Sequence, residues 1–339
     1  MRAAVMTKPF TIEFREIAQP VPKPHEVLVR VQAAGICGSD VHFYDGSNPY
    51  ANYPQTFGHE LSGIVEAVGD ETPSSLVGKR VVVEPAVPCG HCYACSINRP
   101  NACANIDMIG SVRAGGFADY VTVPAHHVHA MPDDMRFEVG ALCEPFSIGA
   151  QAIRRSGMKG GETVAILGMG PIGLTILSQL KRTIDATVFA IDVVPERLQL
   201  ALDFGADAVI DARDVDIVAH ILSKTNGEGA NIVLEAAGLP KTIEQTIHLV
   251  SAAGRIVIVG LTGQDVRFPG QLLTKKDIEI YGTRHSVGLF PAVMQFLHEN
   301  PDVADKFISQ RMDFTELESA LKLAKSQPAQ VTKIILSYS

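Results

Sequence analysis

Hydrophobic and polar positions divide the chain into two parts with different patterns. Up to about residue 148, short runs of β-branched residues alternate with turns rich in glycine and proline, as in residues 27–31, 62–69 and 80–83. Many short strands separated by turns are typical of a barrel-like all-β domain. From about residue 150, buried-strand runs alternate with helical stretches, which predicts a parallel, doubly wound sheet. The sequence therefore predicts an α/β protein with a β-barrel domain and a doubly wound domain.

The end of the chain changes pattern once more. Residues 332–336 form another strand-like run, and we expect this tail to return to the first domain and complete it. The predicted domains are therefore residues 1–148 completed by 285–339, and residues 149–284. In the second domain the predicted strands are 163–167, 187–191, 208–210, 231–234, 255–259 and 278–281, and the predicted helices include 172–181 and 195–204.

Composition and charge narrow the classes of function. The 339 residues are 46% hydrophobic and 19% charged, which indicates a packed globular protein. A net charge of −8 without a run of lysine or arginine argues against a nucleic-acid partner. Residues 1–9 lack the apolar core of a secretory signal, and glycines and a proline interrupt the apolar stretch 164–180. We therefore expect a cytoplasmic protein with no membrane partner.

Residues 168–173, GMGPIG, fit the pattern G-x-G-x-x-G. The pattern alone is weak, because glycines recur by chance, but here it follows a predicted buried strand and opens an apolar helix. The glycines allow a tight turn and a close approach to a pyrophosphate, which would lie on the N-terminus of the helix. The motif therefore predicts a dinucleotide site whose candidate contacts are Gly168, Gly170, Pro171, Ile172 and Gly173.

Asp192 ends the second predicted strand of this unit, nineteen residues after Gly173. Its carboxylate can accept hydrogen bonds from the adenosine ribose hydroxyls and would repel a 2′-phosphate, while Val193 beside it brings no charge. This predicts NAD rather than NADP, with Arg197 as a further candidate contact to the cofactor. The alternative is an ordinary exposed aspartate beside a structural turn.

Four of the six cysteines, which are Cys89, Cys92, Cys95 and Cys103, fall within fifteen residues. Overlapping C-x-x-C pairs suit tetrahedral zinc, and four thiolates would close its coordination shell. The cluster therefore predicts a structural zinc. An iron–sulfur cluster and disulfide bonds are the alternatives.

Four other residues of the first domain are candidate ligands of a catalytic zinc. They are Cys37 in GICGSDVH, His59 and Glu60 in GHE, and Glu144 in CEP. A catalytic zinc uses three protein ligands and leaves one position open. Taken singly, each residue fits a structural role, such as a small core residue or an interdomain salt bridge. The combination with the cysteine cluster and the dinucleotide motif favours the catalytic interpretation.

These motifs resemble the zinc-dependent medium-chain dehydrogenase/reductase family, the alcohol dehydrogenase superfamily, over essentially the whole chain. The stretch GHELSGIVEAVG from Gly58 is similar to the signature of its zinc-containing members. The resemblance implies a GroES-like barrel domain and a Rossmann domain. LCEPFSIG around Glu144 is similar to the polyol branch, with sorbitol dehydrogenase and bacterial L-galactonate 5-dehydrogenase.

The resemblance also implies roles for individual residues. Cys37 and His59 correspond to ligands of the catalytic zinc, and either Glu60 or Glu144 completes the set while the other touches a water. It further implies two zinc ions per chain, NAD, and a homodimer or homotetramer. The remaining implied roles are proton acceptor for Ser39, outer end of the proton relay for His42, and substrate contact for Arg284 and Tyr44.

The function that this resemblance implies is oxidation of a secondary alcohol on a small polyol or sugar acid to a ketone. A threonine- or simple-alcohol-type dehydrogenase is an alternative substrate class. A zinc-free quinone reductase would lack Cys37 and the four-cysteine loop, and both are present. A non-catalytic zinc- and nucleotide-binding relative would have a broken proton relay, whereas Ser39 and His42 are present.

Overall fold

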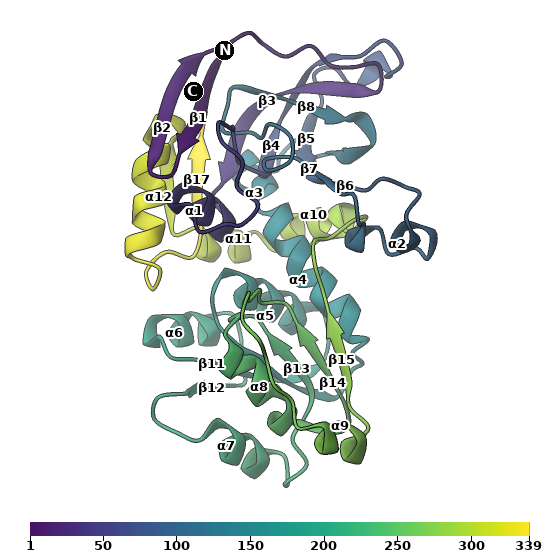
Figure 1. Cartoon of the computed structure of the whole chain (residues 1–339), viewed down its shortest axis with the longest axis vertical. Coiled ribbons are helices and arrows are strands. Elements are labelled where there is room, and N and C mark those ends of the chain that lie inside the picture. Colours follow the sequence, from purple (N-terminus) through teal and green to yellow (C-terminus); the bar gives the residue numbers. More distant parts are fainter. Residues whose placement is uncertain (339) are drawn as a thin grey trace. The chain divides into compact units, whose positions relative to one another are not determined.

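The computed structural model describes residues 1–338 and divides them into two compact units (Figure 1). Unit 1 contains Met1–Ser147 and the described residues from Ser286 onward, and unit 2 is Ile148–His285. No helix among the described residues is both long and apolar enough to cross a membrane.

The main sheet of unit 1 joins strands from both ends of the chain, because β17 of the tail pairs antiparallel with β3 (Figure 1). The strand order is β16-β17-β3-β4-β5-β9, and β8 also pairs with β3. Strand β3 is buried along most of its length and has partners on both edges. The strands are β3 (Glu26–Gly35), β4 (Glu60–Val68), β5 (Arg80–Val83), β8 (Tyr120–Pro124), β9 (Val128–Ala130), β16 (Gln310–Asp313) and β17 (Ile334–Ser337).

Two smaller sheets and several short helices complete unit 1. Its core contains side chains from the main sheet and the C-terminal helix, together with the stacked rings of Phe43 and Phe57, whose centroids are 4.3 Å apart. The remaining elements are β1 (Arg2–Lys8) paired with β2 (Thr11–Glu16), β6 (Ala86–Val87) paired with β7 (Asp107–Met108), α1 (Gly38–Asp45), α2 (Tyr93–Ser96), α3 (Phe137–Ala141), α10 (Phe290–Glu299), α11 (Pro301–Phe307), α12 (Leu317–Ser326) and the 3₁₀ turns η1 (Ser74–Leu76), η2 (Pro100–Ala102), η3 (Ala125–His127) and η4 (Phe314–Glu316).

Unit 2 is built on a six-stranded sheet in which every neighbouring pair is parallel. The strand order is β12-β11-β10-β13-β14-β15. Along the chain, β10 comes first, β11 and β12 are added on one side of it, and β13, β14 and β15 are then added on its other side. The runs that predicted buried strands form these strands, because both faces of such a sheet are covered by helices. The strands are β10 (Glu162–Leu167), β11 (Ala186–Asp192), β12 (Ala208–Asp211), β13 (Ala230–Glu235), β14 (Val250–Ile258) and β15 (Glu279–Gly282).

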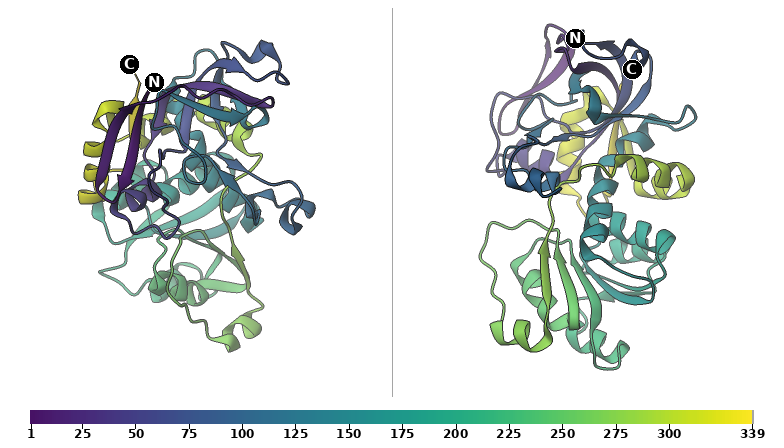
Figure 2. Two further views of the ribbon diagram at one scale, coloured as in Figure 1. Left: turned by 45° about the horizontal axis from the view of Figure 1, so that its top comes forward. Right: turned by 90° about the vertical axis from the view of Figure 1, so that its right-hand side faces the viewer.

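Helices lie on both faces of this sheet (Figure 2). Three of them have proline in the first turn, where the missing N–H costs no helical hydrogen bond. The predicted α/β class is confirmed. The helices are α4 (Cys143–Ser156), which crosses the boundary between the units, and α5 (Pro171–Thr183), α6 (Pro195–Asp203), α7 (Ile217–Lys224), α8 (Pro240–Leu249) and α9 (Gly270–Lys276).

Candidate metal and cofactor sites

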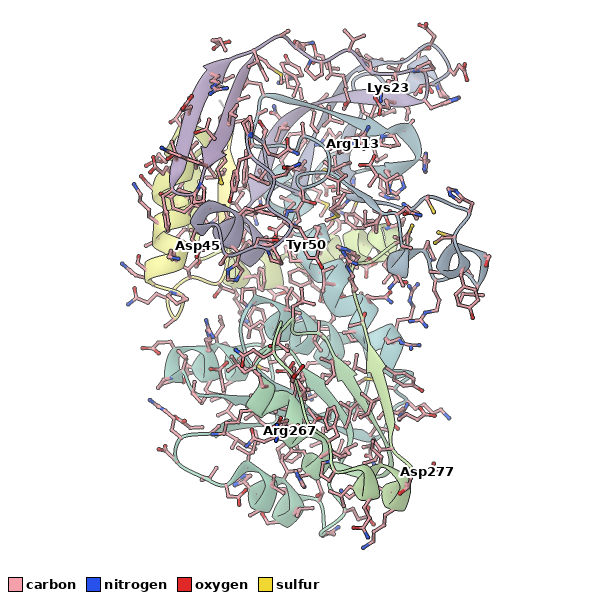
Figure 3. All side chains as sticks on the ribbon, viewed as in Figure 1. Lys23, Asp45, Tyr50, Arg113, Arg267 and Asp277 are labelled. Atoms are coloured by element: carbon pink, nitrogen blue, oxygen red, sulfur yellow. The ribbon has the colours of Figure 1, made fainter. Side chains whose placement is uncertain are left out.

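The first candidate site begins where β3 ends and α1 starts. Cys37 is the N-cap residue of α1, and Asp40 in the first turn accepts a hydrogen bond from its main-chain N–H at 2.9 Å. This hydrogen bond fixes the start of the helix. The helix ends at Asp45, labelled in Figure 3, before a left-handed Gly46. Cys37 is thus held on a defined turn rather than on a free loop.

His59 lies in the loop directly before β4, with its imidazole almost fully buried. Its Nδ1 is 3.6 Å from Oδ1 of Asp40, an oxygen that has no hydrogen-bond partner among the described residues. Burial lowers the pKa of His59, but the Asp40 carboxylate and the Cys37 thiol outweigh burial and raise that pKa well above its ordinary value. A carboxylate facing one imidazole nitrogen orients the ring and leaves the other nitrogen for a metal. Asp40 was not among the residues predicted from the sequence.

Glu60 is the first residue of β4 and pairs with Gly35 of β3. Its carboxylate lies against this glycine so closely that a Cβ on Gly35 would be 1.9 Å from Oε2 of Glu60. The carboxylate is completely buried. Gly35 therefore provides the space that Glu60 occupies, and a side chain at position 35 would displace the carboxylate.

Lys333 neutralises this buried carboxylate. The residue directly precedes β17, and its Nζ donates hydrogen bonds to Oε1 and Oε2 of Glu60 at 2.6 and 2.8 Å and to the carbonyl of Ile36 at 3.0 Å. Only 3% of Lys333 is exposed. The pairing follows from the topology, because β17 and β4 lie on opposite edges of β3 near its end. Sequence reasoning missed Lys333, since nothing in the pattern of residues 332–336 separates an inward-pointing lysine from a surface one.

The possible ligand atoms of Cys37, His59 and Glu60 all lie within 4.8 Å of one another. Glu144, in the first turn of α4, is not part of this group, although it is 7% exposed and close enough for the charges of His59 and Glu60 to act on it. Burial raises the pKa of Glu144 to about 7, and the Glu60 charge adds to this effect. A thiol, an imidazole and a carboxylate are the donors that zinc takes in proteins, so the group of three fits zinc.

The structure places the remaining predicted residues of unit 1 in different environments. Ser39 is half-buried in the first turn of α1, two residues after Cys37. His42 is exposed, and its Nδ1 lies 2.9 Å from Oγ of Ser47. Tyr44, which the sequence predicts as a substrate contact, is 1% exposed and packed in the core. Its hydroxyl donates a hydrogen bond to Oε1 of Glu318 at 3.1 Å, so the polar end of this buried side chain has a partner inside the protein.

The four-cysteine cluster forms a second possible metal site. The ligand atoms of Cys89, Cys92, Cys95 and Cys103 lie within 4.8 Å of one another, and none of these cysteines is in a disulfide. Sγ of Cys92 is 3.5 Å from that of Cys95 and 3.8 Å from that of Cys103. Tetrahedral zinc with bonds of about 2.3 Å requires sulfur separations of about 3.8 Å. Hydrogen bonds from the main-chain N–H groups of Ala104 and Cys95 lower the pKa of Cys92 to about 6, which favours the thiolate.

The predicted dinucleotide turn connects β10 to α5 in unit 2. Gly168 has a φ of 94°, and Gly170 is the N-cap residue of α5, with Pro171 and Ile172 opening the helix. A Cβ on Gly173 would lie 1.9 Å from the carbonyl oxygen of Gly168, so the turn and the helix approach each other as closely as the backbones allow. The free N–H groups at this helix start suit a pyrophosphate.

Asp192 ends β11 and is 8% exposed. Its Oδ2 accepts from the N–H of Met169 at 2.6 Å, and its Oδ1 accepts from the N–H groups of Val193 and Val194 at 2.7 and 3.0 Å. The carboxylate therefore also holds the glycine-rich turn in place. Nη1 of Arg197 lies 3.9 Å from Oδ2 of Asp192. A positive charge therefore stands close to Asp192, although its sequence neighbour Val193 is uncharged. The predicted substrate residue Arg284 is an exposed residue of unit 2 after β15.

Comparison with known proteins decides the family. One family model that matches the chain is described as an alcohol dehydrogenase GroES-like domain, over residues 23–133, and another as a zinc-binding dehydrogenase, over residues 171–299. Sorbitol dehydrogenase from Bacillus subtilis (strain 168) is 32% identical, with 99% of this chain and 97% of that protein covered. The chain belongs to the zinc-dependent alcohol dehydrogenase superfamily. The predicted family and its two fold types are thereby confirmed.

Solved structures of this superfamily match the whole chain. The structure of RspB from Escherichia coli CFT073 in complex with NADH is 34% identical, covers 99% of both chains and has a TM-score of 0.94. A putative zinc-binding dehydrogenase from Sinorhizobium meliloti 1021 bound to NADP is 31% identical, covers 99% of this chain and 98% of the other, and has a TM-score of 0.91. Zinc and a nicotinamide dinucleotide are thus the cofactors of the family, and different relatives carry different dinucleotides.

Proposed function

We propose that this zinc-dependent alcohol dehydrogenase oxidises a secondary alcohol of a small polyol or sugar acid to the ketone, with NAD as the hydride acceptor. The observation that carries the proposal is the convergence of Cys37, His59 and Glu60 in one unit of a chain whose other unit has a complete dinucleotide turn. Sorbitol dehydrogenase among the relatives supports a polyol as the substrate.

In this proposal Cys37, His59 and Glu60 would hold the catalytic zinc, and Glu144 would stand next to it without binding it directly. The grouping of the donor atoms favours Glu60 over Glu144. Bound zinc would act as a Lewis acid that makes the substrate alcohol easier to deprotonate. Lys333 would keep the Glu60 carboxylate charged and in position, and Asp40 would orient His59.

The proton of the alcohol would go to Ser39, which is half-buried near Cys37, and leave through His42. His42 is exposed, which supports its role as the outer end of the proton relay. Ser47 would hold its ring through the hydrogen-bonding contact to Nδ1. An imidazole can both accept and donate a proton, which suits a group that passes a proton to solvent. The four cysteines would hold the second zinc, whose closed shell gives it a structural role.

Asp192 supports NAD as the cofactor, because a 2′-phosphate would be repelled by its buried carboxylate. Arg197 is the feature that favours the other cofactor, since a guanidinium near the ribose can accommodate that phosphate. Both dinucleotides therefore belong in the test. For the substrate, Arg284 supports a carboxylate group, as in a sugar acid, and its contact with the substrate remains a prediction from the sequence.

The test is a spectrophotometric screen at 340 nm of NAD and NADP reduction with polyols, aldonates and amino-acid alcohols. The proposal expects turnover of a polyol or an aldonate with NAD, and loss of turnover in Cys37→Ser with NADH binding retained. Turnover of amino-acid alcohols alone would favour the threonine-type alternative. Zinc-loaded protein that binds NADH but oxidises no member of the panel would favour a non-catalytic relative and contradict the proposal.

A further inference from the structure

Glu235 is a buried carboxylate that the proposed reaction leaves without a role. It is the last residue of β13, and none of its surface is exposed. Burying a charged group is costly unless hydrogen bonds compensate, so a glutamate kept at such a position must stabilise something specific. Burial raises the pKa of Glu235, although hydrogen bonds oppose the shift.

One oxygen of Glu235 organises the loop that follows the strand. Oε1 accepts hydrogen bonds from the main-chain N–H groups of Ala237 and Gly238 at 3.0 and 2.9 Å and from Oγ1 of Thr242 at 2.7 Å. The loop turns tightly, with Gly238 at a φ of 72°. The carboxylate therefore holds the main chain of residues 236–239 and links this loop to the first turn of α8.

The other oxygen of Glu235 faces the next loop. Oε2 is buried without a hydrogen-bond partner among the described residues, and a Cβ on Gly260 would lie 2.8 Å from it. The same Cβ would lie 2.2 Å from the nitrogen of Gly238, so the loops after β13 and β14 are in close contact. The carbonyl of Glu235 accepts from the N–H groups of Val259 and Gly260 at 2.8 and 3.0 Å. Glu235 thus fixes two neighbouring loops at once.

These loops lie where the order of the sheet reverses. Strand β13 is the neighbour of β10 on the side away from β11, so Glu235 ends the strand at the switch point. Doubly wound sheets bind a dinucleotide across this point, one mononucleotide over each half. Asp192 and the turn at residues 168–170 belong to the half with β10, β11 and β12, and Glu235 belongs to the other half. A Cβ on Gly168 would lie 2.8 Å from the nitrogen of Ala237, so the Glu235 loop touches the glycine-rich turn directly.

We propose that Glu235 is a positioning residue for the nicotinamide half of the cofactor. It shapes the loops after β13 and β14 so that their outer main-chain groups are ready to receive the nicotinamide mononucleotide. The adenosine half depends on Asp192 and the glycine-rich turn instead. The inference rests on the proposed function, since it requires that the protein binds a nicotinamide dinucleotide.

The test compares the affinity for NADH with the affinity for AMP by calorimetry, with the zinc-loaded protein. AMP contains only the adenosine half, so a change confined to the nicotinamide half alters NADH binding alone. Glu235→Ala should weaken NADH binding at least tenfold and change AMP binding less than twofold. Glu235→Gln, which keeps an acceptor oxygen for the three donors, should bind NADH within threefold of the wild type. Glu228→Ala, at an exposed position of the same unit, is the control and should bind both ligands normally.

Equal weakening of NADH and AMP binding in Glu235→Ala would mean a merely structural role and would overturn the inference, as would unchanged NADH binding. If Glu235→Ala does not fold, Thr242→Val decides the question, because it removes a single donor to Oε1. It should weaken NADH binding two- to fivefold with AMP unaffected, and unchanged NADH binding in that variant would overturn the inference. A wild type that binds AMP but no NADH or NADPH would refute the proposed function itself.

Discussion

Replacement of Lys333 by methionine removes the ammonium group that donates hydrogen bonds of 2.6 and 2.8 Å to the buried carboxylate of Glu60. Methionine preserves the length and the apolar part of the side chain. Breaking a buried ion pair by removing one partner costs about 3–5 kcal/mol, because the other charge stays buried. The carbonyl of Ile36 also loses a donor.

Removal of Lys333 leaves the Glu60 carboxylate buried without its positive partner. We therefore expect Lys333→Met to destabilise the protein by about 3–5 kcal/mol at pH 7.

The assay is urea unfolding in the presence of a chelator, so that zinc cannot supply the missing positive charge. The chain has no tryptophan, and every tyrosine except Tyr281 lies in unit 1, so tyrosine fluorescence reports mainly on the unit that contains Lys333. Lys322→Met is the matched control. The side chain of Lys322 is 63% exposed in its ion pair with Glu318, and exposed pairs contribute less than about 1 kcal/mol to stability.

The double variant Lys333→Met with Glu60→Gln separates the ion pair from general packing. Removal of both charges should restore at least half of the lost stability at pH 7, since no buried charge then lacks a partner. A loss below about 1 kcal/mol at pH 7, or a double variant less stable than Lys333→Met alone, would refute the reasoning.

Three further outcomes are expected. Because the pKa of Glu144 is raised to about 7 in the folded protein, the metal-free protein binds more protons than the unfolded chain between about pH 4.5 and 7. Its stability should therefore fall as pH rises through this range, by about 3 kcal/mol relative to Glu144→Gln in urea unfolding, and parallel pH profiles of the two proteins would contradict this. Asp40→Asn keeps an acceptor for the N-terminus of α1 but loses the charge that faces His59, so chelator competition should show a 10- to 100-fold weaker catalytic zinc site; an affinity within twofold of the wild type would exclude that role. Asp192→Ala should lower the ratio of kcat/KM for NAD to that for NADP at least tenfold and weaken both cofactors, because the glycine-rich turn loses a support; an unchanged ratio would contradict the assignment of cofactor preference.

Local patterns explain why the fold was predictable. The run at residues 80–83 forms β5 with the same bounds, and the predicted helix at 172–181 lies within α5, because strand and helix periods are set by nearby residues. The dinucleotide turn was predictable for the same reason, since strand, glycines and helix are consecutive. The prediction for the tail was less accurate. The strand predicted at 332–336 begins at Ile334 in the structure.

Residues whose roles depend on distant partners were not predictable in the same way. Lys333 is 273 positions from Glu60, and only the pairing of β17 and β4 with β3 brings the two together. The family resemblance implied a substrate contact for Tyr44, whereas its ring is buried and packs edge-on against the exposed Phe10. A free aspartate and one that already accepts three main-chain hydrogen bonds look alike in a sequence, which is the case for Asp192.

The zinc content of the purified protein tests the central claim most directly. Elemental analysis should find two zinc ions per chain in the wild type, one in Cys37→Ser and one in Cys103→Ser, because the two ligand groups share no residue. The ion that remains in Cys37→Ser should resist chelation more strongly, as a closed four-thiolate shell predicts. One zinc or none in the wild type, or loss of the same ion in both variants, would contradict the account of two separate zinc sites.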